Sequence, residues 1–360
     1  MSVTTPEPTR STNQGSLGST LNGRRLPRWA PLASAAVALV LAVGITQVGS
    51  IVGLAWPVLW AIFFLVVQTG WSFSTEGRRH AVDRLATTLI YGCVILAVAP
   101  LLSVLFSVVS RGAATVLTDF PSFLTETMRN VSPRKPGGGV AQAIVGTLEQ
   151  VTIAALVAVP LGILAAVYLV EYGRGRLAKT VSFFIDVMTG VPSIVAGLFI
   201  YTFWVLTAGF ERSGFAASLA LVILMIPVVV RTTEEMLKIV PNDLREAAYA
   251  LGIPKWKTIL RIVIPTALSG IITGVMLAVA RVSGETAPLL LTVVLSQSMN
   301  WNPVAGPQAA LPTFVWDQVS SGTDASINRA WGGALVLIIL VVIFYTAARL
   351  LARLFAPKAH

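Results

Sequence analysis

The sequence predicts an all-α polytopic membrane protein, and three observations support this fold class. Hydrophobic residues make up 55% of the 360 residues, charged residues make up 12%, and the mean hydropathy is +0.79. Soluble domains average about 25% charged residues. The apolar residues also form uninterrupted blocks of about 18 residues or more, a length that crosses a bilayer as a helix. We therefore expect the chain to fold within a membrane.

The first apolar block predicts a hairpin of two spans. No ionisable side chain occurs between Arg28 and Glu76. A single helix of that length would extend about 70 Å, over twice the hydrocarbon thickness. We expect two helices within residues 29–75, separated near residues 47–50, where Gly49 and polar neighbours interrupt the run. Six further spans are expected at residues 85–110, 141–170, 180–208, 214–231, 266–295 and 331–351, which gives about eight.

The distribution of Lys and Arg predicts the orientation. With the N-terminus inside, 19 of the 26 Lys and Arg residues fall in inner segments, six fall in outer segments, and Arg281 lies within a span. Short cytoplasmic loops retain positive charge, so both termini are expected in the cytoplasm. The same asymmetry accounts for the net charge of +10, and membrane lipid rather than nucleic acid is the expected environment. Residues 1–28 are predicted to be a disordered cytoplasmic tail.

Covalent chemistry is not expected of this chain. Cys93 is the sole cysteine, and His80 and His360 have no metal-ligand spacing. No G-x-x-x-x-G-K-[ST] phosphate loop occurs, so the chain should not hydrolyse ATP. We therefore predict no enzyme activity, no metal and no bound cofactor.

The segment Pro241–Pro265 is the first feature that points to a particular function. Asn242 or Asp243 is expected to cap a short helix that stops at Gly252, and a second helix is expected from about Pro254. Small residues, among them Ala247, would let another protein surface approach closely. A helix lying on the membrane surface is the alternative, because Trp256 stands between two lysines. Composition alone leaves both interpretations open.

A resemblance favours the docking interpretation. The sequence Glu246-Ala-Ala-x3-Gly252-x9-Ile262-x-Ile264-Pro265 resembles the EAA motif of ABC importer permeases. In that family the short helix sits in a groove of the ATPase subunit and transmits its motion. The resemblance implies a cytoplasmic coupling loop over residues 233–265, with contact to the ATPase by Glu246, Ala247, Ala248, Gly252 and Pro265.

The second feature is a pair of charges near the middle of the seventh apolar stretch, Arg281-Val-Ser-Gly-Glu285-Thr-Ala-Pro-Leu. A charged residue at the centre of a span costs roughly 2.5 to 3.5 kcal/mol to insert. On one helix, residues i and i+4 share a face and can pair. The pair is therefore either a self-neutralising contact that fixes helix packing or an anion site, in which the guanidinium binds a tetrahedral oxyanion.

The same stretch resembles the seventh-span signature of phosphate-specific ABC importer permeases of the PstA type. Pro160–Tyr172 and Gly190–Leu198 are similar to segments of that family, and the resemblance covers about residues 80–355. It implies a type I core of six helices, as in molybdate and maltose permeases. We expect this core to occupy residues 76–355, after the hairpin at 29–75 and before a tail at 356–360. It also implies a multi-pass protein of the bacterial inner membrane whose substrate pathway includes Arg281, Ser283, Glu285 and Thr286.

The resemblance further implies partners: a second permease of the PstC type, an ATPase dimer of the PstB type that binds ATP and Mg²⁺, and an external phosphate-binding protein of the PstS type. Two alternatives to a phosphate importer stay open. One is an ABC permease for another oxyanion, such as sulfate or molybdate, and the other is a proton-coupled secondary anion transporter.

Glycine and proline predict interruptions of two spans. Breaks in a membrane helix are tolerated beside protein or a water-filled cavity, so a broken helix that lines the pathway is one interpretation and a packing kink is the other. Glu149 and Asp186, near predicted helix ends, are expected to reach headgroups or a neighbouring Arg. The residues assigned to helix breaks or gating are Gly190, Pro192, Gly197, Gly284 and Pro288.

Overall fold

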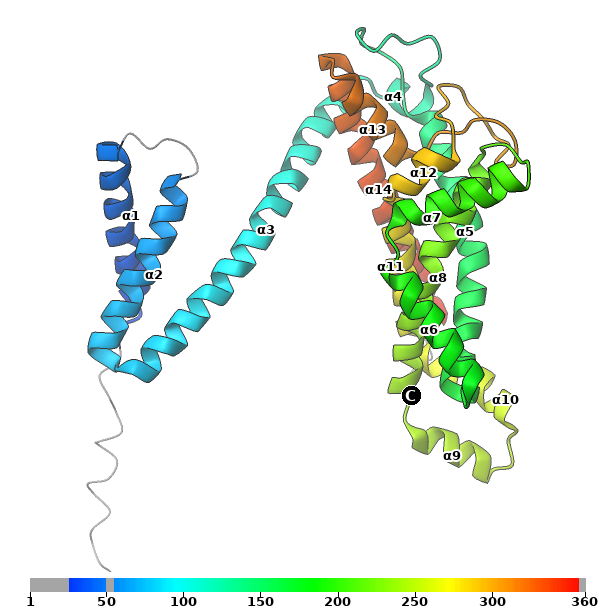
Figure 1. The fold of residues 1–360 in the computed structure, drawn as a ribbon, viewed down its shortest axis with the longest axis horizontal. Helices are drawn as coiled ribbons and strands as arrows, with labels where there is room; N and C mark the ends of the chain where they lie inside the picture. The colour runs from blue at the N-terminus through cyan, green and yellow to red at the C-terminus, as the bar shows by residue number, and fades with distance from the viewer. Residues whose placement is uncertain (1–25, 50–54, 356–360) are drawn as a thin grey trace, which may run out of the picture. The chain divides into compact units, whose positions relative to one another are not determined.

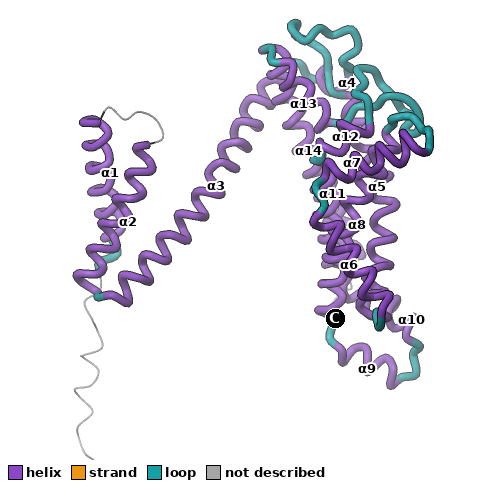
Figure 2. The backbone as a smooth tube through the Cα atoms, in the orientation of Figure 1, coloured by secondary structure: helices purple, strands orange, loops and turns teal. Residues whose placement is uncertain are grey.

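The computed structural model describes residues 26–49 and 55–355, and every secondary-structure element in these residues is helical (Figure 2). The predicted all-α fold class is confirmed. Of the predicted N-terminal tail only residues 26–28 are described, and the predicted tail at 356–360 lies outside the described residues.

Seven helices in the described part of the chain are long and apolar enough to span a membrane, and a bent pair of helices raises the number to eight if it counts as one span. Eight is the number predicted. The long helices are α1 (Ala30–Gly49), α2 (Ala55–Glu76), α3 (Arg78–Thr118), α5 (Ala141–Val167), α8 (Gly214–Ile239), α11 (Ile264–Ser283) and α14 (Asp324–Phe355). α5 continues as the π-helix η1 (Tyr168–Tyr172), and the π-helix η3 (Ile259–Val263) leads into α11. The bent pair is α6 (Arg176–Gly190) and α7 (Ser193–Ile200), which continues as the π-helix η2 (Tyr201–Thr207).

Two of the predicted spans are interrupted. The span expected at residues 180–208 is the bent pair, and the span expected at 266–295 is divided into α11 and the short helix α12 (Ala287–Thr292). The remaining short helices are α4 (Ser122–Thr125), α9 (Asn242–Ala250), α10 (Lys255–Thr258) and α13 (Leu311–Ser321).

The chain divides into two compact units between Val104 and Leu105, inside α3. In the first unit α1 and α2 form the expected hairpin (Figure 1). The Glu76 carboxylate, at the end of α2, accepts hydrogen bonds from the Leu26 backbone N–H, the Ser72 hydroxyl and the Arg84 guanidinium. These bonds join the start of α1 to the turn between α2 and α3. The domain boundaries drawn from the sequence at residues 28, 75 and 355 stay predictions.

The second unit is a helix bundle built around α5 and α8, which pack along each other. Its core contains small and branched apolar side chains such as Ala154, Ala158 and Leu221. Small residues let membrane helices approach closely. α11 lies against α8 and α14, and α7 lies against α8 and α12. Figure 1 places α9 and α10 at one end of this unit and α4 and α13 at the other, named here the α9 end and the α13 end.

Candidate solute pathway and coupling site

The predicted coupling helix is present as α9, at the α9 end of the bundle. It starts after Pro241, whose side chain makes no capping hydrogen bond, so the expected cap by Asn242 or Asp243 is wrong. Proline is tolerated at this N-cap position because its φ of −58° is allowed there and the N–H groups at a helix start have no intrahelical partner. After the helix, Gly252 has a φ of +75°, the left-handed region that favours glycine.

α9 carries three of the five residues assigned to coupling and exposes two of them. Glu246 and Ala247 are exposed, as is Gly252 beyond the helix. Ala248 is 2% exposed and is the one buried side chain of α9. Pro265 lies more than a helical turn further on, in the first turn of α11. The residues of the EAA-like motif therefore do not form one surface: one side of α9 is open, Ala248 is on its packed side, and Pro265 belongs to α11.

One arginine ties α9 to the ends of two long helices. The Arg245 guanidinium donates to Glu171 Oε1 from Nε at 3.0 Å and from Nη2 at 2.9 Å. It also donates to the carbonyl of Leu237 at 3.0 Å and to that of Val240 at 2.6 Å, at the C-terminus of α8. The helix dipole places partial negative charge there, which a cation stabilises. Arg245 thus joins α9, η1 and α8.

A second contact comes from α10. The Lys255 ammonium donates to the Glu171 carbonyl and lies 4.7 Å from the centre of the Tyr172 ring. Trp256, between Lys255 and Lys257, is exposed, and this feature suits a membrane surface or a docked protein equally well.

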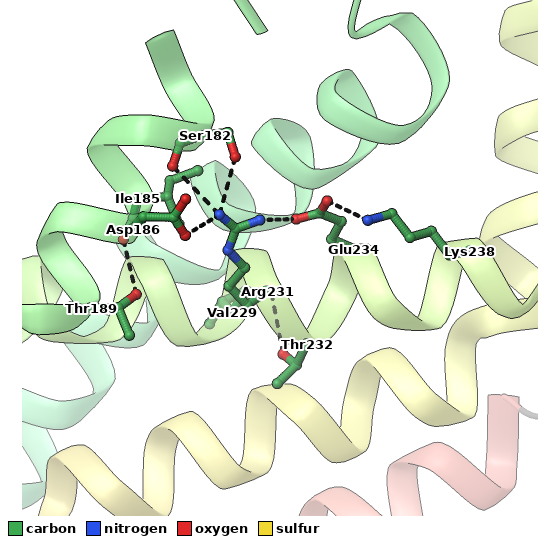
Figure 3. A network of polar contacts seen from close by, with 9 residues as sticks. All are labelled: Ser182, Ile185, Asp186, Thr189, Val229, Arg231, Thr232, Glu234 and Lys238. Atoms are coloured by element: carbon green, nitrogen blue, oxygen red, sulfur yellow. Dashed lines mark hydrogen bonds and ion pairs between the residues drawn. The ribbon is translucent and has the colours of Figure 1, made fainter. Parts of the chain in front are cut away.

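A polar network connects α8 to α6 (Figure 3). Arg231 of α8 forms an ion pair with Asp186 of α6 and donates to the Ser182 hydroxyl at 3.1 Å. It also donates to Glu234 at 2.6 Å, and Glu234 accepts from Lys238 at 2.7 Å. The sequence led us to expect that Asp186 and Glu149 reach lipid headgroups or a neighbouring Arg. Asp186 pairs with Arg231, whereas Glu149 accepts a hydrogen bond from the side-chain amide of Gln308. The network fixes α6 just before its break.

The break between α6 and α7 turns the chain by 107°. Gly190 is the last residue of α6, and Pro192 immediately precedes α7. Both residues are at the predicted interruption, although the gating role stays a prediction.

The prediction that Gly197 breaks a helix is wrong, because this residue lies inside α7 and does not interrupt it. A Cβ at this position would be 2.5 Å from the Pro288 Cα and 2.9 Å from the Pro288 carbonyl oxygen. Glycine is therefore required here for the close approach of α7 to α12.

The charged pair of the seventh apolar stretch is also arranged differently from the sequence expectation. Arg281 is in the last turn of α11, and Glu285 lies in the three-residue connection to α12, so the two do not share one helical face. The break follows from Gly284, which ends α11, and from Pro288 in the first turn of α12. Within the described residues neither side chain has an ion pair or hydrogen bond, which removes the self-neutralising interpretation for this conformation.

The other two predicted pathway residues differ in accessibility. Ser283 is buried, and its hydroxyl donates to the Val279 carbonyl at 2.7 Å, one turn earlier. Thr286 is half-buried at the start of α12. Arg281 is exposed and Glu285 is half-buried, so these side chains and Thr286 are the accessible groups of the four. In the part of the chain that the structure describes, no three His, Cys, Asp or Glu residues gather as a metal site.

Sequence reasoning missed two buried polar clusters at the α13 end. The Arg329 side chain, 3% exposed, donates to three loop carbonyls, those of Pro133, Lys135 and Gly137, and to Gln318. Gln308 accepts from Gln150 of α5 at 2.9 Å. No short-range pattern could have identified either cluster, since the partners lie far apart in the sequence.

Comparison with known proteins places the chain in a family. The family model described as "Binding-protein-dependent transport system inner membrane component" matches residues 158–360. The chain belongs to this family. It is thus a multi-pass inner-membrane component of a transport system that works with a binding protein.

Relatives of high similarity are PstA proteins. The chain is 47% identical over 274 residues to "Phosphate transport system permease protein PstA 1" of Mycobacterium tuberculosis (strain ATCC 25618 / H37Rv). This match covers 76% of the chain and 88% of the relative. It is 50% identical over 278 residues to PstA of Mycobacterium leprae, with 76% and 91% covered. It is 40% identical over 287 residues to PstA of Yersinia pestis, and this match covers 79% of the chain and 94% of the relative. The PstA type of permease, predicted from the sequence, is confirmed.

Among solved structures, the inward-facing MetNI methionine ABC transporter is similar, with 20% identity and a TM-score of 0.48 over 61% of this chain and 95% of that one. An amino acid ABC transporter with histidines has 21% identity and a TM-score of 0.45 over 59% and 93%.

Proposed function

We propose that this chain is a permease subunit of an ATP-driven importer for inorganic phosphate and forms half of the translocation pathway. The observation that carries the proposal is Arg281, a charged side chain left exposed at the junction of α11 and α12. The chain's 40–50% identity to proteins named as phosphate transport permeases supports phosphate as the solute.

Arg281 suits an oxyanion for physical reasons. An unpaired guanidinium within a membrane segment is costly unless it faces water or a partner. Its planar fork of donors matches the oxygens of a phosphate. Thr286 adds a hydroxyl that can donate to the same ion, and Glu285 opposes tight binding of an anion. An anion held this way can be released, as transport requires.

Energy for transport comes in this proposal from a separate ATPase pair, which holds ATP and Mg²⁺, while this chain binds no cofactor. α9 is the element that docks on it, because its open side carries the exposed residues Glu246 and Ala247. The α9 end then faces the cytoplasm, in agreement with the excess of Lys and Arg there. The complete system adds a PstC-type permease, a PstB-type ATPase and an external PstS-type protein.

Reconstitution tests the proposal. The complex purified through this chain in mild detergent should contain an ATPase, a second permease and, when phosphate is present, a phosphate-binding protein. In liposomes it should take up phosphate only with ATP, and excess sulfate or molybdate should not compete. Competition by those ions would favour another oxyanion as the solute, whereas uptake driven by a proton gradient without ATP would identify a secondary transporter.

A further inference from the structure

We propose that the Arg245–Glu171 ion pair is the mechanical link through which α9 moves the membrane core, so that Arg245 and Glu171 are positioning residues for coupling. The inference rests on the proposed function and adds the route by which motion of α9 reaches the bundle. It concerns transmission and not the docking of the ATPase itself.

Apart from Arg245, α9 makes little contact with the bundle. α9 has one buried side chain, Ala248, and its helix contacts are with α10 and η3, which follow it in the chain. Figure 1 shows α9 lying beyond the ends of the long helices. Apart from Arg245, α9 reaches the bundle through its chain connections and through Lys255 of α10, which binds the Glu171 carbonyl. Arg245 is therefore the side chain of α9 itself that contacts both η1 and the end of α8.

The Arg245–Glu171 pair is largely buried. The side chains of Arg245 and Glu171 are 12% and 5% exposed, respectively. Surface ion pairs are weak and easily broken, but removing one partner of a buried pair is strongly unfavourable because a charge is left without compensation. The pair therefore resists separation when α9 is displaced.

The pair is anchored at the ends of the two central helices, α5 and α8. Glu171 belongs to the π-helix that ends α5, and Arg245 also binds two carbonyls at the end of α8. π-helical turns often occur at functional sites, since they distort a helix locally. α5 and α8 are the two helices that pack most extensively in the second unit. A displacement of Arg245 thus acts on both central helices together.

Further contacts continue from α8 to the connection between α11 and α12. α8 is joined to α6 by Arg231 and Asp186, just before the 107° break. α7 then meets α12 at Gly197 and Pro288, beside the connection that carries Glu285. Rigid helices joined by polar contacts can carry coupling between distant sites.

The test uses the complete importer in liposomes and measures phosphate moved per ATP hydrolysed. Glu171→Gln keeps the shape of the side chain and leaves Arg245 bound to the carbonyls of α8, whereas Arg245→Gln removes both sets of contacts. We expect each variant to lower the ratio about tenfold while the ATPase stays bound, a size usual for coupling between sites. The double variant should lower it no further than Arg245→Gln, because both changes break the same link.

Arg176→Gln is the matched control, since Arg176 is exposed at the start of α6, five residues after Glu171. It should leave the ratio unchanged. If Arg245→Gln fails to fold, Glu171→Gln decides the question alone. An unchanged ratio in Glu171→Gln would overturn the link, and so would loss of bound ATPase in parallel with uptake, which would make the pair a docking element.

Failure of the proposed function is seen separately, in the unvaried complex. An unvaried complex without an ATPase would overturn the proposed function and the link together. If the unvaried complex transports a different oxyanion, the phosphate assignment falls, and the same ratio measured with that ion still tests the link.

Discussion

Gly197 of α7 and Pro288 of α12 are in backbone contact, because the Pro288 Cα lies 2.5 Å from where a Cβ on Gly197 would be. The contact joins the helix after the 107° break to the helix after Arg281 and Glu285. The two interrupted segments of the bundle therefore meet at a residue without a side chain.

Gly197→Ala should destabilise the protein. The added methyl group would force α7 and α12 apart, and overpacking of this kind typically costs about 1–3 kcal/mol. The thermal unfolding midpoint of the purified protein measures the effect. Gly92→Ala is the control, since a Cβ at Gly92 meets no atom within 4 Å. Equal midpoints for the two variants would contradict the contact.

The network of Figure 3 predicts unequal effects for Arg231, at its centre, and Asp186, at one end. Arg231→Met removes every hydrogen bond that joins α8 to α6 in this network, and we expect a loss of about 2 kcal/mol. Asp186→Asn should cost less than about 1 kcal/mol, because the Asp186 side chain is 64% exposed and exposed ion pairs are weak. Chemical or thermal unfolding in detergent compares the two. A larger loss for Asp186→Asn would show that Asp186, and not Arg231, organises the network.

The sequence was sufficient for features that depend on neighbouring residues. The lengths of apolar blocks predicted the spans, since spanning a bilayer depends on composition over one helix. Gly252 and Pro254 predicted where the first short helix at the α9 end stops and where the second begins, because helix ends depend on the residues located there. The cap was wrong because the helix begins one residue earlier than expected, with Pro241 as the N-cap and Asn242 as the first helical residue.

Features that depend on tertiary packing were not predictable. Glu171 and Arg245 are 74 residues apart, and no periodicity relates them. Gly197 looked like a helix breaker because a glycine needed for close approach and one that ends a helix are identical in sequence. Arg281 and Glu285 have the spacing of a helical pair, and only the end of α11 at Ser283 separates them.

Arg329→Met should loosen the loop that precedes α5. Arg329 binds three of the loop's carbonyl oxygens and is buried, so its removal should cost about 3 kcal/mol and expose the loop. Limited proteolysis with trypsin should then cut faster after Arg134. Asn328→Ala, a change at the exposed neighbouring residue, should leave the rate of cleavage unchanged. An unaltered rate in Arg329→Met would mean that the loop is held by other contacts.

Arg281 gives the sharpest test of the pathway. Arg281→Gln removes the charge, and hydrogen bonds to charged groups are worth about 1.5–3 kcal/mol, so phosphate uptake should fall about tenfold to a hundredfold. Arg281→Lys should keep part of the activity, because lysine retains the charge without the planar fork.

Uptake is measured at equal amounts of assembled complex, with Arg79→Gln as the control, since Arg79 is exposed in the first unit. Co-purification of the ATPase should be unaffected in every variant, because Arg281 is at the opposite end of α11 from the residues that follow α9. Unchanged uptake in Arg281→Gln would remove Arg281 from the pathway, whereas an equal loss in both Arg281 variants would show that the fork, and not the charge, recognises the anion.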